Sequence, residues 1–466
     1  NAAERGMSYG LQTTDEWNKG AITHSAEQAL RRRKGIAFDD AEIQRLAQEE
    51  AKYRTFQDDN AASNVLKGLK DTLNMAGIGE KKQIGRRQVY EFGLGDLVQK
   101  YTQVPGALII RSVEYSPLGY AKALGNIVQA ARSRSFTPQQ QRKLAMNLGR
   151  ATTGTGFILA FAALSQLGVF TGEQDSEEKR LKNLQNAEGI SSMQINLSGL
   201  GRLIQGKDPK PQKGDVLESV GFLEPMNTLM AMGYDLAQSD GGIKSWKDML
   251  EKKTFEQIVD IPTMQTAKSL VQGLQYDTPP GEILLGIGID SATGFIPSVV
   301  RQSANFFDPV QRDVYNESDS TKKYIGKVKN VVPGVKNTLN PKVTPVGEEK
   351  TNSTGNRAAD FFNTFFNPGS AAIYQPSEIS GELYRMGDLY GESVLPKTAP
   401  KSFSRDGEKI EMSGKEYADF AKVYGKSANA SLKAAVNSDL YQNADDDGKS
   451  KLLEAAIAEA DDAAKE

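Results

Sequence analysis

The chain has no cysteine and only one histidine, His24. Without cysteine, disulfide bonds, thiolate metal sites and cysteine nucleophiles are excluded. Any serine–histidine triad would have to use His24. That residue stands between Thr23 and Ser25, a polar setting typical of a surface side chain. We therefore expect neither a metal ligand nor a catalytic base there.

Complete phosphate-binding and metal-binding motifs are also missing. Gly-Lys-Ser occurs at 425–427 and 448–450, but Phe420 and Asn443 stand where a phosphate-binding loop needs its first glycine. Residues 443–454 approach the spacing of a calcium loop, but they begin with Asn instead of Asp. An acidic helix start is the better interpretation of that stretch. The sequence predicts no cofactor, no metal and no enzymatic activity.

Aromatic residues (8%) and hydrophobic residues (38%) are few for one dense globule. The formal net charge of −2 argues against a chain devoted to nucleic-acid binding. A length of 466 residues leaves room for several domains. The chain starts at Asn1 without a secretory signal pattern, and we interpret it as a piece of a longer protein. We expect a mainly α fold, an extended multi-helix assembly with long loops.

One long run is free of charge: ATTGTGFILAFAALSQLGVFTG, residues 151–172. Its length suits a membrane span, but threonine, glycine, serine and glutamine dilute its hydrophobicity. We favour a buried hairpin helix, with conditional membrane insertion as the alternative. Small residues recur four apart and favour close helix packing. The candidate membrane-contacting or helix-packing residues are Thr152, Gly156, Phe157, Ala160, Phe161 and Leu164.

Charge changes sign across this run. Residues 81–150 carry 12 Lys and Arg against 3 Asp and Glu, whereas residues 173–190 carry 5 acidic and 3 basic residues. Such a step matches the positive-inside bias of membrane proteins. The basic stretch is also suited to contact DNA or anionic lipid. The candidate basic surface comprises Arg111, Lys122, Arg132, Arg134, Arg142 and Lys143.

The composition divides the chain into four segments. They are a charged helical segment (1–100), a helical core with the apolar hairpin helix 151–172 (101–315), a linker or extended arm (316–366) and a C-terminal module (367–466). The arm is rich in Asn, Ser, Thr, Lys, Pro and Gly, a composition typical of connecting segments.

The C-terminal hundred residues carry the strongest local signals. Asp406-Gly407 between two short alternating runs predicts a β-hairpin. Ser413 and Glu416 have the spacing of a capping box that opens a helix. We expect a small separate module of a hairpin and three helices. Just upstream, FFNTFF (361–366) is expected to dock onto a neighbouring subunit or its own core, with membrane insertion as the less favoured alternative.

Several stretches together resemble one protein family. They are VEYSPLG (113–119), RATTGTGFILAFAALSQLGVFTG (150–172), INLSGLGRLIQGKDPKPQKGD (195–215), FDPVQRDVY (307–315), NPGSAAIYQPSEISGELYRM (367–386), VLPKTAPKSF (394–403) and 412–457. In this order they resemble the C-terminal region of the very large polyvalent proteins of tailed bacteriophages and prophages. Enzymatic domains of that family lie upstream of this region, so the resemblance assigns no catalytic residue here.

The resemblance implies a non-enzymatic internal virion (ejection) protein, part of a larger chain. Such a protein is carried in the capsid interior or at the portal or tail and is transferred to the host envelope at infection. We expect a homo-oligomer that helps to form a conduit for DNA delivery. Its expected partners are portal or tail proteins, other internal proteins, packaged DNA and the host membrane. The alternatives are a static portal- or capsid-docking protein and the non-catalytic C-terminal part of a giant virion enzyme such as a virion RNA polymerase.

Overall fold

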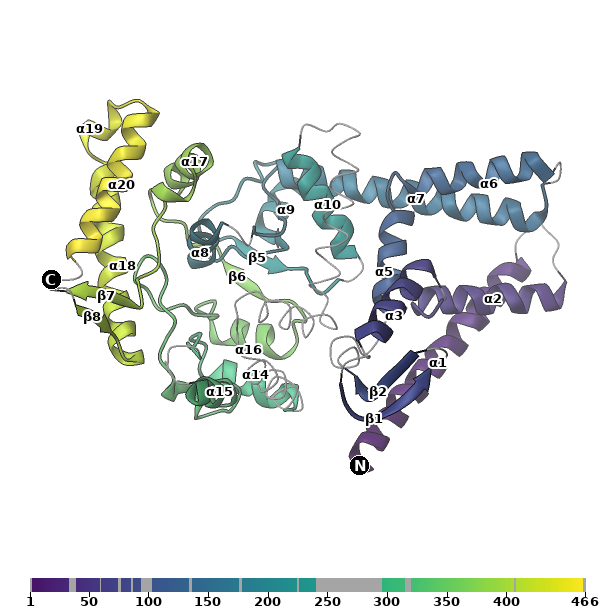
Figure 1. Cartoon of the computed structure of the whole chain (residues 1–466). Helices are drawn as coiled ribbons and strands as arrows, with labels where there is room; N and C mark the ends of the chain where they lie inside the picture. Colours follow the sequence, from purple (N-terminus) through teal and green to yellow (C-terminus); the bar gives the residue numbers. More distant parts are fainter. Residues whose placement is uncertain are drawn as a thin grey trace. The chain divides into compact units, whose positions relative to one another are not determined.

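The computed structural model is mainly helical, with 65% helix and 6% strand, which confirms the expected fold class (Figure 1). The structure describes residues 2–32, 39–58, 60–73, 77–84, 87–93, 103–133, 136–175, 178–223, 226–239, 296–314, 320–405 and 408–463. The chain forms two compact units, 1–160 with 238–277 and 161–237 with 278–466. This division differs from the four predicted segments, because 101–315 is split between the units and 316–466 belongs to one of them.

The first unit is built mostly from helices. Its elements are α1 (Ala2–Arg32), α2 (Asp40–Arg54), α3 (Ala61–Leu73), β1 (Gly77–Ile84), β2 (Arg87–Gly93), α5 (Gln103–Glu114), α6 (Gly119–Ser133) and most of α7 (Pro138–Gln166). Helix α2 begins after Asp39, whose carboxylate accepts a hydrogen bond from the backbone N–H of Glu42 at 2.7 Å. Leu30 of α1 packs against Ile43 and Leu46 of α2.

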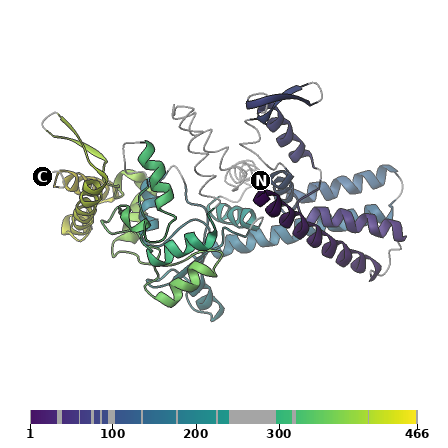
Figure 2. The same cartoon turned by 90° about the horizontal axis from the view of Figure 1, so that it is seen from below.

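Strands β1 and β2 pair antiparallel, from Gly77 opposite Gly93 to Ile84 opposite Arg87 (Figure 2). The expectation that residues 1–100 are helical is therefore wrong for this hairpin. Val89, Tyr90 and Phe92 are strand-favouring types, and the many glycines nearby disfavour a helix.

Helices α6 and α7 lie side by side (Figures 1 and 2). The predicted start of α7 is confirmed, since the Thr137 hydroxyl accepts a hydrogen bond from Gln140 N at 3.3 Å and Pro138 occupies the first turn. Gly154 of α7 packs directly on the turn between α5 and α6. A Cβ at Gly154 would lie 1.9 Å from the carbonyl oxygen of Tyr115.

Helix α7 ends at Gln166, so the run 151–172 is not one hairpin helix. Gly168 adopts a φ of 70°, and its N–H donates to the carbonyl of Ser165 while Val169 N–H donates to that of Leu164. This pattern is a Schellman helix end, which needs glycine at the left-handed position. Phe170 and Thr171 then enter a β-strand. Within the part of the chain that is described, no helix is both long and apolar enough to cross a bilayer.

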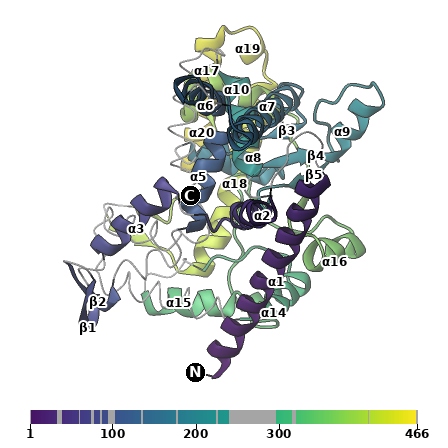
Figure 3. The same cartoon turned by 90° about the vertical axis from the view of Figure 1, so that its right-hand side faces the viewer.

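The second unit combines a small sheet with several helices (Figure 3). Its elements are β3 (Phe170–Thr171), α8 (Lys179–Ala187), β4 (Gln194–Asn196), α9 (Leu197–Ile204), β5 (Val216–Ser219), α10 (Met226–Gln238), α14 (Ser298–Phe307), α15 (Ser320–Lys329), η2 (Lys336–Thr338), α16 (Arg357–Phe365), β6 (Ala371–Ile373), α17 (Ser380–Tyr390), η3 (Gly391–Val394), β7 (Ser402–Arg405), β8 (Glu408–Glu411), α18 (Gly414–Val436), α19 (Asp439–Gln442) and α20 (Asp446–Ala463). The sheet is antiparallel with strand order β3-β4-β5-β6.

Residues 316–366 are folded rather than forming a linker. They include α15, η2 and α16, and bridges join Thr351 to Val310 and Pro341 to Arg312. The ammonium of buried Lys336 donates hydrogen bonds to Asn305 Oδ1 at 3.0 Å and to the carbonyl of Asp308 at 2.6 Å. These contacts fix the segment to α14. Its polar composition therefore belongs to irregular but packed backbone and not to a linker.

The predicted C-terminal hairpin and helices are present but are not a separate module. Strands β7 and β8 pair from Ser402 opposite Glu411 to Arg405 opposite Glu408, and Ser413 and Glu416 form the predicted capping box. Asp406-Gly407 lies outside the described residues. One core of buried residues in the unit combines α17, α18 and α20 with Leu184 of α8. Strand β6 pairs with β5, which joins the module to residues 216–218.

Candidate functional site

Among the described residues, the predicted strip of small residues on α7 is exposed, with one contact to α6 at Thr152. Thr152, Gly156 and Ala160 are exposed, and a Cβ at Gly156 would meet no atom within 4 Å. The buried face of this part of α7 instead contains Gly154 and Ile158. Within the described residues, the strip is therefore mostly exposed and contacts α6 at Thr152.

The remaining apolar candidates on α7 contribute to packing. Phe161 is buried, and its ring meets the ring of Phe170 edge-on with centroids 4.9 Å apart. Phe157 and Leu164 are half-buried. Because Phe161 anchors the helix end to β3, it has a structural role in the second unit.

An exposed apolar surface runs along α6 and α7. Leu124, Ile127 and Val128 lie one helical turn apart on α6 and are 61%, 46% and 49% exposed. Leu148 and Leu159 are exposed on α7. The Tyr120 hydroxyl of α6 is 3.1 Å from the Thr152 hydroxyl of α7, which places the two exposed faces next to each other. We call these five aliphatic residues the α6–α7 surface.

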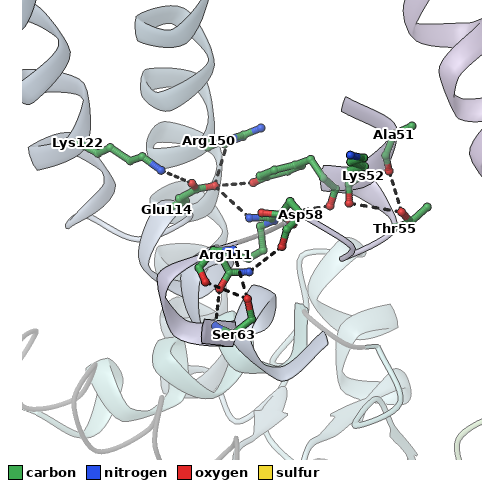
Figure 4. Close-up of polar contacts among 11 residues, drawn as sticks. Ala51, Lys52, Thr55, Asp58, Ser63, Arg111, Glu114, Lys122 and Arg150 are labelled. Atoms are coloured by element: carbon green, nitrogen blue, oxygen red, sulfur yellow. Dashed lines mark hydrogen bonds and ion pairs between the residues drawn. The ribbon is translucent and has the colours of Figure 1, made fainter. Parts of the chain in front are cut away.

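The basic candidate Arg111 is buried, which corrects the prediction that it is part of a basic surface. Its side chain is 5% exposed, and one Nη donates to Asp58 Oδ1 at 2.6 Å and to the carbonyl of Tyr53 at 3.1 Å (Figure 4). The partners lie on the preceding α2–α3 region, so the burial of Arg111 depends on tertiary contacts that its sequence neighbours do not reveal.

Glu114 is the centre of the same ion cluster. Its carboxylate accepts hydrogen bonds from the Lys122 ammonium, from Arg150 Nη1 at 3.1 Å and from the Tyr53 hydroxyl at 2.6 Å (Figure 4). The Tyr53 ring lies between the guanidinium groups of Arg111 and Arg150, 3.2 and 3.7 Å from its centroid. These contacts connect α2, α5, α6 and α7, so the cluster holds the first unit together.

The electrostatics of the cluster follow from these contacts. Burial alone would raise the pKa of Glu114, but hydrogen bonds from Lys122 and Tyr53 and the charges of Lys122 and Arg150 outweigh it and lower that pKa. Burial, together with the hydrogen bond to the Glu114 carboxylate, raises the pKa of Tyr53. Glu114 is therefore ionised and paired at neutral pH, and Tyr53 is a neutral donor.

The other basic candidates differ in exposure. Arg142 is largely buried and lies 3.7 Å from Glu50, which again differs from the expected surface position. Lys122 is half exposed but is paired with Glu114. Arg132 and Lys143 are exposed as expected. Arg134 lies outside the described residues.

A second apolar surface combines α14 and α16. Phe306 packs edge-on against Phe361 and Phe365, with centroids 5.6 and 5.8 Å apart, so FFNTFF docks partly onto its own unit. Four rings nevertheless remain exposed, and sequence reasoning assigned them no common surface with α14. We call Phe307, Phe361, Phe362 and Phe366 the aromatic surface.

The positions considered for metal binding have other partners. His24 is exposed, and its Nε2 is 2.9 Å from Gln28 Nε2, one turn further along α1. Asp445 accepts a hydrogen bond from Gly448 N at 2.8 Å, so the calcium-like stretch is the acidic start of α20 as expected. No group of three His, Cys, Asp or Glu suited to a metal occurs among the residues that are described.

Two adjoining polar cavities lie in the second unit, with volumes of about 490 and 230 Å³. Both are lined by Asn186, Gln311, Thr344 and Lys350. Sequence reasoning missed them, because their walls come from α8, the bridged segment around 341–354 and other distant parts of the chain.

Comparison with protein-family models, with curated protein sequences and with solved structures gives no match to this chain. The resemblance to phage polyvalent proteins therefore stays a prediction.

Proposed function

We propose that this chain is a non-enzymatic structural protein that assembles as an oligomer, and that it serves as an internal (ejection) protein of a tailed-bacteriophage particle. In that role it is carried in the capsid interior or at the portal or tail. It contacts portal or tail proteins, other internal proteins and packaged DNA, and it helps to form a conduit across the host envelope. The observation that carries the proposal is the α6–α7 surface.

Helix α6 carries both buried and exposed apolar side chains. Ala123 and Ala130 are buried, whereas Leu124, Ile127 and Val128 are exposed. Burying aliphatic surface contributes about 25 cal/mol per Å², and contiguous exposed apolar patches mark interaction sites. A second copy of the same surface would cover these side chains.

The aromatic surface supports a second contact, with another virion protein. Phenylalanine is enriched at the cores of protein interfaces. Phe362 and Phe366 pack on each other with ring centroids 5.3 Å apart, while each stays more than 60% exposed. A rigid pair of rings loses little conformational entropy when a partner covers it.

The proposed phage context depends on the resemblance. Two of the stretches that carry the resemblance lie where secondary-structure elements are joined. Residues 113–119 span the end of α5, with Glu114, and the turn into α6. In the stretch 195–215, the carboxylate of Asp215 accepts from Asn196 Nδ2 at 2.7 Å and from Arg202 Nη2 at 2.6 Å. The Arg202 guanidinium, against the effect of burial, lowers the pKa of Asp215 to about 2. The stretches that carry the resemblance thus include residues whose hydrogen bonds hold local turns and helix ends in place.

One observation favours the alternative of a static docking protein. The end of the apolar run 151–172 is held by the contact between Phe161 and Phe170 and by the pairing of Phe170 with Ile195. Inserting this run into lipid would break those contacts. A conduit would therefore be made by the assembled oligomer, whereas a docking protein would need no lipid contact.

Vesicles distinguish these two functions. The chain is mixed with phosphatidylethanolamine–phosphatidylglycerol vesicles that contain a self-quenching dye, and flotation and dye release are measured. For the conduit we expect both, with loss in the Leu124→Glu, Val128→Glu double variant and retention in Gln129→Glu, which adds a charge at an exposed polar position of the same helix. Wild-type chain that neither floats nor releases dye would support static docking instead.

A further inference from the structure

The smaller cavity of the second unit has the features of an anion site. Its volume is about 230 Å³, below the 300–1,000 Å³ typical of pockets for drug-sized ligands. The lining includes two lysines, two asparagines and two threonines: Lys342, Lys350, Asn183, Asn186, Thr344 and Thr398. Every one of these side chains can donate a hydrogen bond.

Lys350 lies at the boundary between the two cavities, with its backbone fixed on both sides. Its N–H donates to the carbonyl of Lys342 at 2.9 Å, and its carbonyl accepts from Gln311 N at 2.8 Å. The side chain is half-buried, and its ammonium makes no hydrogen bond or ion pair with the described residues. A half-buried cation without a partner is unfavourable unless an anion joins it.

The charges around Lys350 make a bound anion still more favourable. Burial lowers the pKa of Lys350, and the positive charges of Lys342 and Lys182 lower it further. Among the described residues, no carboxylate contributes to this shift. A bound anion would relieve the repulsion among the three lysines.

Three carboxylates also line the cavities, and one of them, Asp313, lines the smaller cavity together with Tyr417. The charge of Asp313, after burial, contributes to the raised pKa of Tyr417. Glu349 lines the larger cavity and forms an ion pair with Lys422 at 2.7 Å. Glu348, in the larger cavity, is exposed. None of them neutralises Lys350.

We propose that the smaller cavity binds a phosphate group, held by the ammonium groups of Lys350 and Lys342 with the side-chain amides of Asn183 and Asn186. The Thr344 hydroxyl accepts a hydrogen bond from Glu348 N at 3.1 Å and keeps its own proton to donate. The phosphate is either a free inorganic anion or the phosphoryl group of a small molecule whose remainder fills the adjoining cavity of about 490 Å³. This site is independent of the proposed assembly function.

Calorimetry and thermal unfolding of the full chain with inorganic pyrophosphate, inorganic phosphate and adenosine monophosphate test the site. We expect saturable binding, a rise in the unfolding temperature, and at least a tenfold loss of affinity in Lys350→Met. Lys207→Met, on an exposed loop of the same unit, should bind like the wild type. Tighter binding of the nucleotide than of both inorganic anions would assign the larger cavity to the rest of a phosphorylated molecule.

Two further results separate binding from folding. Lys350→Met removes a repelled charge and keeps the aliphatic stem, so the unliganded variant should unfold at the wild-type temperature or above. Asn186→Asp keeps the size of the side chain but adds a negative charge to the cavity, and it should also weaken binding tenfold or more. The proposal is overturned if the wild type binds none of the three anions at millimolar concentration, or if both variants bind as tightly as the wild type.

Discussion

The hydroxyl of Tyr53 donates a hydrogen bond to the carboxylate of Glu114, across 61 residues of sequence, at 2.6 Å. The same carboxylate pairs with Lys122 and Arg150 and is only 6% exposed. A single acidic side chain thereby neutralises cations from two helices. Removing it would leave Arg150, which is only 13% exposed, without its carboxylate.

Glu114→Gln should lower the free energy of unfolding of the first unit by roughly 3 kcal/mol, because it breaks a buried ion cluster. Glu49→Gln is the matched control, since Glu49 forms an exposed pair with Arg45 on α2 and should cost less than about 1 kcal/mol. Urea unfolding followed by hydrogen exchange in α5 and α7 measures both. Equal losses of unfolding free energy in the two variants would show that the buried cluster stabilises the unit no more than an exposed ion pair does.

The same cluster predicts a direction of pH dependence. The pKa of Glu114 in the folded chain lies below its ordinary value of 4.5, because hydrogen bonds and neighbouring cations outweigh burial. Its contribution is fully present above about pH 4.5 and is lost as pH falls through the folded pKa. Exchange protection of α5 should therefore decrease below pH 4.5 in the wild type and change less in Glu114→Gln. A parallel pH dependence in both would contradict this assignment.

Glu188 in the second unit should behave in the opposite way. It is buried, accepts hydrogen bonds from the hydroxyls of Ser380 and Tyr384, and has a pKa raised by burial. Its stabilising effect is present while it is protonated and is lost as pH rises through the raised pKa. Glu188→Gln should thus unfold at the same or a higher temperature than the wild type at pH 8, with the gain shrinking toward pH 4. A loss of equal size at both pH values would refute the prediction.

Two glycines of α7 give a matched pair of variants. A Cβ at Gly154 would collide with the carbonyl of Tyr115, whereas a Cβ at Gly156 meets nothing within 4 Å. Gly154→Ala should destabilise by roughly 1–3 kcal/mol through overpacking. Gly156→Ala should stabilise by about 0.5–1 kcal/mol, because alanine favours the helix. Thermal unfolding of both variants checks this, and changes of the same sign would place the packing face of α7 elsewhere.

The features that the sequence predicted correctly are encoded within a few residues. The start of α7 at Thr137 and Pro138 and the capping box at Ser413 and Glu416 each depend on a four-residue pattern. The residues of the aromatic surface on α16 were also visible as FFNTFF, but their contact with Phe306 of α14 was not.

The features that were missed depend on contacts between distant residues. The sheet pairs strands of two to four residues, and β6 joins β5 across more than 150 residues, so no periodic pattern marks it. Arg111 looked exposed in a basic stretch, but its partner Asp58 lies 53 residues earlier. The cavity at Lys350 likewise requires α8 and the bridged segment to meet.

The central claim, assembly through the α6–α7 surface, is tested most directly by sedimentation velocity of the full chain over a range of concentrations. We predict that the wild type and Gln129→Glu sediment as an oligomer, and that the Leu124→Glu, Val128→Glu double variant sediments as a folded monomer with unchanged helical content. A wild-type chain that remains monomeric at all concentrations, or a double variant that assembles like the wild type, would contradict the account.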